Sequence, residues 1–307
     1  MTSTAILAHY DPDGQAAGYV LRLLDQLGSC FDDVVVATTA ALTEEARSAL
    51  GARSRLIERE NLGQDFGGWR EVLRDHVDVS RTDRLLLTND TFVGMLRPLD
   101  TLIADMSARP VEFWGITENQ QIARHVQSFF VMVSEPVLRS RVWDGFWGGF
   151  AAQADRSKVI RNHEVGLSQN LLAAGFDAAA YYQPTAAEAA LAERREAWRR
   201  SRMQQLDPTG ERAATTHPNH TYALADAALR DGRLPLVKIE ALRYDPCFLG
   251  EGVLLDLCER HRPDAFEGVR DYLERTATAY PPRPGENPGG APAPTGDVAD
   301  LAYRADL

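Results

Sequence analysis

Short apolar runs alternate with helical patterns through the first half of the chain, and this alternation restricts the fold more than any other feature. The predicted strands cover residues 4–10, 33–38, 55–59 and 84–88. Helical spacing of apolar residues predicts helices over 15–28, 43–51 and 67–77. Strands and helices that alternate at this spacing form βαβ units. We therefore expect an α/β fold with a Rossmann-type, mostly parallel sheet flanked by helices.

The second half continues this pattern less regularly. Strands are predicted over 111–116, 126–133 and 178–183, helices over 135–150, 163–174, 186–206, 220–230 and 250–261, and an extended stretch over 235–243. We expect a single domain over residues 1–275, with a long arginine-rich helix at 186–206 and a helical and extended part at 207–262. Residues 276–307 are rich in proline and glycine, which predicts a disordered tail.

Composition and charge exclude several classes of protein. The net charge of −11 argues against a nucleic-acid partner, because phosphate binding needs a basic face. The three cysteines, Cys30, Cys247 and Cys258, lack CxxC spacing, which argues against a disulfide framework and a cysteine zinc site. The sequence also predicts no signal peptide and no transmembrane segment. We expect a cytoplasmic protein.

Polar side chains and glycines follow four of the predicted strands. Ligands of open α/β sheets bind beyond the carboxyl ends of the strands. The residues at these ends are His9 to Gly14, Asn61 to Trp69, Asn89 with Asp90, and Thr117 to Asn119. A purely structural sheet does not need carboxylates, amides and glycines at all four ends. The sequence therefore predicts a polar ligand site at this edge of the sheet.

The segment NLGQDFGGW at residues 61–69 is the most informative of the four. Its glycines allow a ligand to approach the backbone closely. Asp65 can accept a hydrogen bond from a ribose hydroxyl or a base N–H, and Asn61 can both donate and accept. The GxGxxG spacing of dinucleotide-binding folds does not occur here. The alternative is a tight turn before a helix, which would explain Gly67 and Gly68 but neither Asp65 nor Asn61.

Two acidic residues have both a chemical and a structural interpretation. Asp90 ends an apolar strand, where its carboxylate can ligate a divalent cation, Mn²⁺ or Mg²⁺, that bridges a diphosphate. The alternative is a turn cap formed with Asn89. Glu164, near the start of a predicted helix, can act as a general base toward an acceptor hydroxyl. The alternative is stabilisation of the helix dipole.

Three sets of basic residues are equally open to two interpretations. His220 can ligate a metal or contact a diphosphate, or can be a solvated loop residue. Lys238 can contact phosphate or be a surface charge. Five arginines between residues 194 and 202 surround Trp198 and predict either a peripheral contact with the inner face of a membrane or a solvated helix face.

Six segments together resemble the rhamnan synthesis protein F family of glycosyltransferases. The segments are NLGQDFGGW (61–69), LLLTNDTFVG (85–94), FWGIT (113–117), HVQSFFVMV (125–133), HEVGLSQNLLAAGF (163–176), and PNHT followed by LVKIEALRYDP (218–221 and 236–246). Their order and spacing fit the family over roughly residues 5–260.

The resemblance implies a GT-A-like fold and an inverting glycosyltransferase that acts in polysaccharide or glycoconjugate biosynthesis. It implies a nucleoside-diphosphate sugar as donor, with TDP-rhamnose or another deoxysugar donor as the default, and a glycan or lipid-linked acceptor. It also places the metal motif at Asn89 and Asp90, the catalytic base at Glu164 and the nucleotide loop around Asn61 and Asp65. Three positions depart from the expected pattern: Asn89 replaces an acid, Gly166 replaces a second acid, and His220 replaces a proline.

The resulting hypothesis gives each candidate residue a role. Glu164 is the catalytic base, and Asp90 with His220 holds the cation. The donor and its nucleotide are contacted by Tyr10, Asp11, Asn61, Gly63, Asp65, Asn89 and Lys238. The sugar or acceptor pocket is lined by Trp69, Trp114, His125, Gln127 and His163.

Two rival functions come from other classes of protein. One is a non-catalytic subunit that binds a nucleotide sugar or a glycan within a polysaccharide assembly complex. The other is a nucleotide-dependent oxidoreductase on a Rossmann sheet, against which the missing GxGxxG segment argues.

Overall fold

The computed structural model describes residues 2–206, 217–230, 232–281 and 293–304. The chain divides into two compact units. The first unit comprises Met1–Asp90 and Arg97–Tyr181, and the second comprises Thr91–Leu96 and Tyr182–Leu307.

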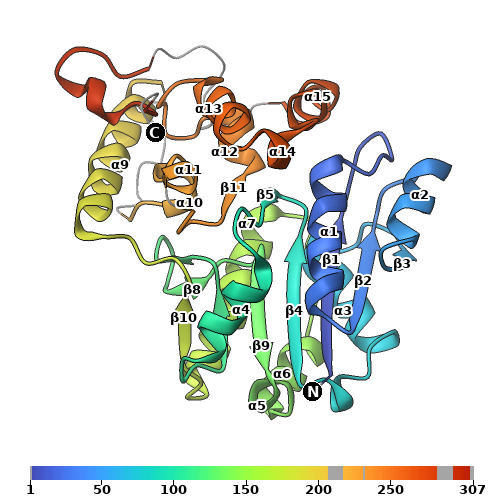
Figure 1. Ribbon diagram of the computed structural model, residues 1–307. Coiled ribbons are helices and arrows are strands. Elements are labelled where there is room, and N and C mark those ends of the chain that lie inside the picture. The colour runs from blue at the N-terminus through green and yellow to red at the C-terminus, as the bar shows by residue number, and fades with distance from the viewer. Residues whose placement is uncertain (1, 207–216, 231, 282–292, 305–307) are drawn as a thin grey trace. The chain divides into compact units, whose positions relative to one another are not determined.

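A seven-stranded sheet forms the centre of the first unit (Figure 1), in the order β10-β6-β9-β4-β1-β2-β3. The strands are β1 (Ser3–His9), β2 (Asp33–Thr38), β3 (Arg55–Glu58), β4 (Arg84–Asn89), β6 (Phe113–Gly115), β9 (Phe130–Ser134) and β10 (Ala178–Ala180). β1 pairs in parallel with β2 and β4, β2 with β3, and β6 with β10, whereas β9 runs antiparallel to β4 and β6. The predicted α/β class with a mostly parallel sheet is confirmed.

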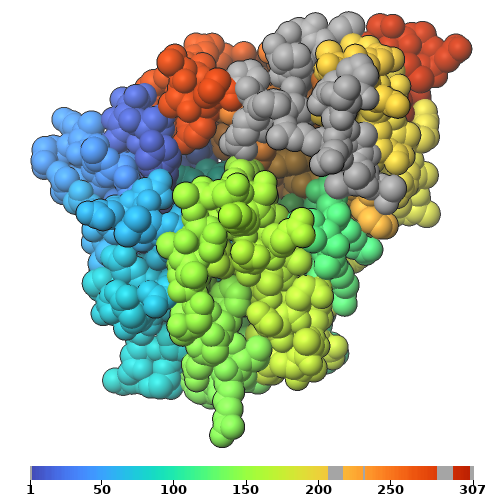
Figure 2. All heavy atoms as spheres, turned by 180° about the vertical axis from the view of Figure 1, so that it is seen from behind, coloured from blue at the N-terminus to red at the C-terminus, as the bar shows by residue number. Residues whose placement is uncertain are grey.

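Helices cover both faces of this sheet. One face carries α3 (Gln64–Asp75), η1 (Val79–Arg81), α5 (Glu135–Leu138), α6 (Arg141–Gly148), α7 (Arg156–Val159), η2 (Ile160–Val165) and α8 (Gly166–Ala173). Figure 2 shows this side of the unit, with α3 in light blue and α5 to α8 in green. The other face carries α1 (Gly18–Cys30) and α4 (Leu99–Ser107), which contact each other, while α2 (Glu44–Gly51) packs beside β3.

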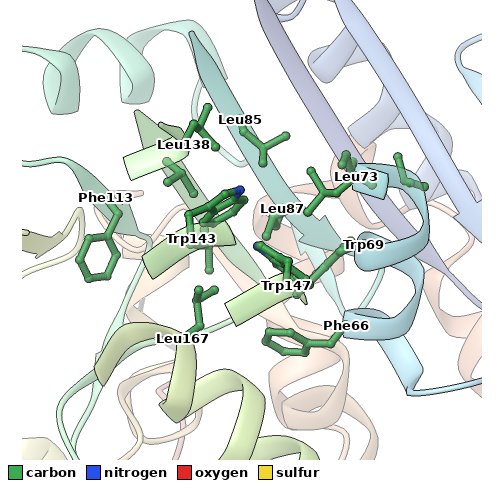
Figure 3. Packing of buried hydrophobic residues seen from close by; sticks show 14 of the residues in the cluster. Phe66, Trp69, Leu73, Leu85, Leu87, Phe113, Leu138, Trp143, Trp147 and Leu167 are labelled. Carbon is green, nitrogen blue, oxygen red and sulfur yellow. The ribbon is translucent and has the colours of Figure 1, made fainter. Parts of the chain in front are cut away.

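The apolar residues of the central strands are buried on both sides, as parallel sheets require. Every residue of β1 is buried, and so are five of the six residues of β2 and of β4. Against one face pack Phe66 and Trp69 of α3 and Trp143 and Trp147 of α6 (Figure 3). This core fixes the ends of β1 and β4, where the candidate site lies.

The second unit is mainly helical. Its elements are β5 (Phe92–Gly94), α9 (Ala186–Leu206), α10 (His220–Ala223), α11 (Ala227–Arg230), β11 (Leu236–Lys238), α12 (Ile239–Tyr244), α13 (Val253–His261), α14 (Pro263–Phe266), α15 (Val269–Arg275) and η4 (Gly296–Leu301). β5 and β11 form an antiparallel pair. The long helix α9 has the bounds expected from the sequence.

Four predicted elements are divided or change conformation along their length. The helix expected over 220–230 is two short helices, α10 and α11. The strand expected over 126–133 is split into β8 (His125–Val126) and β9, and β8 instead pairs with β7 (Glu118–Asn119). The helix expected over 135–150 is two helices, because Ser140 caps α6 by accepting from the Trp143 amide at 3.2 Å. The stretch expected to be extended over 235–243 turns helical at Ile239.

The arginine cluster at 194–202 is only partly available to a membrane surface. Arg195 is fully buried and forms a bidentate pair with Asp226 at 2.8 and 2.9 Å. A buried, paired guanidinium does not reach lipid, so Arg195 takes no part in such a contact. In the described parts of the chain, no helix combines the length and the apolar character needed to cross a membrane.

The segment expected to be a tail is described over 276–281 and 293–304. Within it, Leu301 and Tyr303 are buried, and the Leu301 and Ala302 carbonyls accept hydrogen bonds from Arg195 at 2.8 and 3.0 Å. Residues 282–292, which carry most of the proline and glycine of this stretch, lie outside the described residues, as do residues 207–216.

Candidate functional site

Asp90 lies half-buried at the end of β4, against the end of β1. The Tyr10 amide donates to its Oδ2 at 2.8 Å, and the Tyr19 hydroxyl donates to its carbonyl oxygen at 2.9 Å. Burial raises the pKa of Asp90 to about 7, the Tyr10 hydrogen bond opposes this shift, and the charges of Asp65 and Asp11 add to it. Three carboxylates therefore act on one another at this end of the sheet.

Asp65 stands in the first turn of α3 and is held by Asn89. The Asn89 side-chain amide donates to Asp65 Oδ2 at 2.8 Å, and Asn89 itself is buried. An amide in place of a second acid thus serves as a donor that orients a neighbouring carboxylate. The two residues come from segments predicted separately to form the site, and the fold brings them into contact.

Tyr10 and Asp11 follow β1 and differ in exposure. Tyr10 is 42% exposed. Asp11 is buried, and its Oδ1 accepts from the Asp13 and Gln15 amides at 2.9 and 3.2 Å. Asp11 therefore holds this loop in its conformation, and the negative charge of Asp11 raises the pKa of Asp90.

The segment 61–69 contains both packing glycines and exposed polar groups. Gly63 precedes α3 with a φ of +81°, a conformation that favours glycine. A Cβ on Gly67 would lie 1.8 Å from the Leu62 carbonyl oxygen, so this glycine is required by the turn itself. Asn61 is exposed at the start of the turn. The turn interpretation accounts for Gly67 but not for Asp65, whose carboxylate accepts from the Asn89 side chain.

The candidate pocket tryptophans lie in the interior of the first unit. Trp69 is fully buried, and its indole N–H donates to the Thr88 carbonyl at 3.1 Å (Figure 3). Trp114 is buried on β6 and packs on Phe130, with ring centroids 5.4 Å apart. Both residues therefore occupy core positions that support the strand ends.

Glu164 meets the segment that follows the β7–β8 hairpin. The Ser128 amide donates to Glu164 Oε1 at 3.1 Å, and His125 Nε2 lies 3.6 Å from the same oxygen. Burial acts to lower the pKa of His125, but the contact with Glu164, the bond to the Ala123 carbonyl and the charges of Glu164 and Glu118 outweigh it and raise this pKa. The pair thus joins a carboxylate to a histidine that favours its charged form.

Glu164 and His163 lie in a π-helical turn, η2, between α7 and α8. π-Helical turns are rare and occur frequently at functional sites. His163 stacks on Phe150 with ring centroids 4.5 Å apart, and its ring lies in a tilted contact with Phe66 at 5.5 Å. Burial lowers the pKa of His163, against the bond to the Ala151 backbone that raises it. His163 is therefore a neutral ring in an aromatic cluster.

Two contacts link the Glu164 side of the site to the Asp90 side. The Thr88 hydroxyl, two residues before Asp90, donates to the Phe129 carbonyl at 2.8 Å, next to Ser128. The tilted ring contact between Phe66 and His163 joins the first turn of α3, which carries Asp65, to η2. Glu164, the predicted base, and Asp90, one of the two predicted cation ligands, therefore belong to one connected region of the first unit.

Gln127 lies between β8 and β9 and bonds to the end of β6. Its side-chain oxygen accepts from the Thr117 hydroxyl at 2.7 Å, and its backbone amide donates to the Thr117 carbonyl at 3.1 Å. Gln127 therefore fixes the loop that carries Ser128.

Lys238 and His220 belong to the second unit. Lys238 is buried and donates from Nζ to the Thr91 hydroxyl. Burial lowers the pKa of His220, against the charges of Glu193 and Glu188, which raise it. Thr91, Glu188 and Glu193, the residues that act on these two side chains, belong to the second unit as well.

Sequence reasoning missed three contributors. Ser128 contributes only its backbone amide, which no residue type signals. The π-helical turn has no sequence signature either. Arg59 donates to Glu71 at 2.9 Å and to the Leu62 carbonyl at 3.0 Å, and so braces the turn before α3. A single arginine after a predicted strand gives no sequence signal that it will hold a neighbouring turn.

The oxygen-rich surroundings of Asp90 suit a hard divalent cation. Among the residues that the structure describes, no three His, Cys, Asp or Glu side chains are grouped closely enough to hold a metal ion by themselves. Mg²⁺ is usually bound by one or two carboxylates together with substrate phosphates. The donor set therefore fits a cation that a diphosphate helps to bind.

Curated relatives of this chain are similar over part of their length. An uncharacterized protein, y4gN, of Sinorhizobium fredii (strain NBRC 101917 / NGR234) is 30% identical over 186 residues, which cover 59% of this chain and 48% of that protein. Virulence protein VirA of Vibrio anguillarum (strain ATCC 68554 / 775) is 36% identical over 117 residues, which cover 36% of each chain. The chain therefore spans about half of the first relative and about a third of the second.

Among solved structures, the chain is similar to glucosyl-3-phosphoglycerate synthase from Mycobacterium tuberculosis. The complex with phosphoglyceric acid and the complex with Mn²⁺, UDP and glucosyl-3-phosphoglycerate both match with a TM-score of 0.32, at 9% and 10% identity. Each match covers 44% of this chain and 57% of the other. A TM-score of this size carries no conclusion about the present chain.

The family model described as rhamnan synthesis protein F matches residues 34–198, more than half of the chain. The match includes the turn before α3, the end of β4 and the Glu164 segment. This chain belongs to the rhamnan synthesis protein F family.

Proposed function

We propose that this chain is an inverting, GT-A-like glycosyltransferase. It moves rhamnose or another deoxysugar from a nucleoside-diphosphate donor, with TDP-rhamnose as the first candidate, to a hydroxyl of a glycan or lipid-linked acceptor. Membership of a family named for rhamnan synthesis supports a role in polysaccharide synthesis. The observation that carries the proposal is the connection of Glu164 to the carboxylates at the end of β4 through Thr88, Phe129 and Ser128.

The carboxylates around Asp90 form the donor side of the proposed site. Asp90 and Asp65 would hold a divalent cation together with the diphosphate oxygens. A bound cation would neutralise charge on the diphosphate as it departs. Asn89 keeps Asp65 oriented, and the exposed Tyr10 ring can stack on the nucleobase.

Glu164 forms the acceptor side. Among the described residues, both contacts of its carboxylate fall on Oε1, so Oε2 can take the proton of the acceptor hydroxyl. The acceptor oxygen then forms a bond to the anomeric carbon. The bond from that carbon to the diphosphate oxygen breaks, the diphosphate keeps the electron pair, and the configuration inverts.

One observation favours the alternative of a non-catalytic subunit that binds a nucleotide sugar or glycan. Glu164 accepts the Ser128 amide and so also holds the loop between β8 and β9. If Glu164 served only to hold this loop, the site would bind a ligand but would have no catalytic base. The two functions differ in what substitution of Glu164 does to turnover.

The test compares Glu164→Gln with wild type in release of TDP from TDP-rhamnose, with an alkyl rhamnoside as acceptor. Glutamine can still accept the Ser128 amide but cannot take a proton, so kcat should fall by about 10²- to 10⁴-fold while donor affinity stays the same. Glu45→Gln is the matched control, an exposed carboxylate in the first turn of α2. Panels of UDP-, GDP- and CDP-sugars identify another donor class.

Near wild-type turnover of Glu164→Gln would contradict its role as base. Donor binding by the wild-type protein without turnover on any donor would favour the binding subunit. A loss in Glu45→Gln as large as that in Glu164→Gln would show that the assay reports folding and not chemistry.

A further inference from the structure

His125 has a hydrogen-bonding environment that differs from that of a residue lining a pocket. Its side chain is 5% exposed, and its Nδ1 lies 2.8 Å from the Ala123 carbonyl oxygen. A carbonyl oxygen can only accept, so Nδ1 carries a proton in either charge state of the ring. In the neutral ring, Nε2 would therefore turn its lone pair toward Glu164 Oε1, 3.6 Å away.

Protonation of Nε2 removes this conflict. The charged ring donates toward both partners, the Ala123 carbonyl and the Glu164 carboxylate, and sets a positive charge beside a negative one. Among the described residues, Glu118 of β7 also acts on the ring with its charge, and it pairs with Arg124 at 2.8 Å. From α8, Ser168 and Gln169 approach the same segment as uncharged groups.

The hairpin segment and the helix are joined on either side of this pair. The Ser168 hydroxyl accepts from the Val126 amide at 3.1 Å, and the Gln169 side chain donates to the Arg124 carbonyl at 2.6 Å. Glu164 and Ser168 lie four residues apart, on one side of the helix. These contacts hold the backbone in place, so the ring of His125 meets Glu164 in a defined position.

We propose that protonated His125 is a positioning residue for the catalytic carboxylate, which it holds by Oε1 so that Oε2 faces the acceptor hydroxyl. This inference rests on the proposed function, in which Glu164 is the base. His125, which the sequence predicted to line a sugar or acceptor pocket, would instead act on the reaction through Glu164.

The dependence on pH follows from the sign of the shift. The pKa of His125 is raised above its usual value of 6.5 by its acidic surroundings. The ion pair is therefore fully formed below pH 6.5 and is lost as the pH rises through the higher pKa of the folded state. Activity should fall along that alkaline limb, with kcat affected more than KM.

The first test is an NMR titration of the histidine Cε1–H signals in wild-type protein and in Glu164→Gln. We expect His125 to titrate above 6.5 in the wild type and at a lower pH in the variant. This readout needs no turnover, so it is independent of the proposed function. A His125 signal that titrates at or below 6.5, or that does not move in Glu164→Gln, overturns the inference.

The second test is the pH profile of TDP release in His125→Gln, with His76→Gln as an exposed matched control. His125→Gln should lower kcat at pH 6.5 by about 10²-fold, as a misplaced base does, and remove the alkaline limb. An unchanged alkaline limb in His125→Gln overturns the inference. Absence of turnover in the wild type with every donor refutes the proposed function and, with it, the catalytic role of His125, while the titration still tests the pair.

Discussion

Single residues of the same type differ here because their surroundings differ. Asp90 has a pKa raised to about 7, whereas Asp32, which accepts from the Ser3 hydroxyl and amide, has a lowered pKa. Burial among other carboxylates disfavours charge, and hydrogen bonds from donors favour it. The carboxylate that a cation would stabilise most is therefore the one at the end of β4.

Asp90→Asn tests this assignment through stability. The folded pKa lies above the ordinary value of 3.8, so the native state loses stability as the pH rises from about 4 to 7, and the full cost is present above 7. The variant should therefore raise the free energy of unfolding at pH 8 in EDTA by about 1–2 kcal/mol, and change it little at pH 4. Thermal and urea unfolding measure this difference, with the exposed Asp105→Asn as control.

The same variant tests ligand binding in a thermal-shift panel with TDP, UDP, GDP, CDP and NAD⁺, each with and without Mn²⁺. A ligand at 100 times its dissociation constant adds about 2.7 kcal/mol to wild-type stability. We expect this gain for one nucleoside diphosphate, with a dependence on Mn²⁺ that Asp90→Asn lacks. An equal gain in both proteins would argue against a cation on Asp90, and a response to NAD⁺ alone would favour the oxidoreductase.

At the scale of elements, the turn before α3 and the π-helical turn η2 place the polar groups of the site. The turn puts Asp65 at the first turn of a helix, within reach of Asn89. The π-helical turn puts Glu164 opposite the Ser128 amide. Both devices depend on contacts with segments distant in sequence.

Two adjacent glycines of α3 give a matched pair of substitutions. A Cβ at Gly67 would lie 1.8 Å from the Leu62 carbonyl oxygen, whereas a Cβ at Gly68 would lie 3.5 Å from the Ala37 Cβ, an ordinary contact. Gly67→Ala should lower the free energy of unfolding by about 1–3 kcal/mol, because the turn must shift. Gly68→Ala should be neutral or stabilising, since alanine favours helix. Urea unfolding of both variants measures this difference. Equal changes in the free energy of unfolding would show that the turn does not require glycine at position 67.

At the scale of the whole molecule, the chain forms two units, each with its own buried core. In the second unit, one arginine of α9 joins residues far apart in the sequence. Arg195 contacts the Ala223 carbonyl, Asp226 and the Leu301 and Ala302 carbonyls, and lies over the Tyr303 ring at 5.5 Å. A buried guanidinium satisfied in this way fixes the segment around η4 onto α9.

Arg195→Ala should destabilise the protein by about 3–5 kcal/mol, because Asp226 would be left buried without its partner. The neighbouring Arg194→Ala removes an exposed pair with Asp300 and should change the free energy of unfolding far less, because solvent screens such pairs. Urea unfolding and hydrogen exchange of residues 296–303 measure both effects. Equal protection of these residues in the two variants would show that Arg195 does not anchor the segment.

The sequence alone sufficed for the main strands and helices between β1 and β4 and for the class of the sheet. β2 (Asp33–Thr38) matches its predicted bounds, and α2 begins where a threonine, Thr43, can cap it by accepting from the Ala46 amide. Such features depend on residues close together in the chain, where apolar period and capping chemistry act directly. The segments that carry the family's pattern were visible for the same reason.

Only the tertiary structure decided how the candidate residues work. Trp69 looked like a pocket residue and lies in the core, and Asn89 looked like a missing acid and orients Asp65. His125 contacts Glu164 from 39 positions away, across a hairpin where one long strand was expected. Burial and hydrogen-bond partners arise from segments that meet only on folding, so the pKa and role of each polar side chain follow from the fold and not from its neighbours in the sequence.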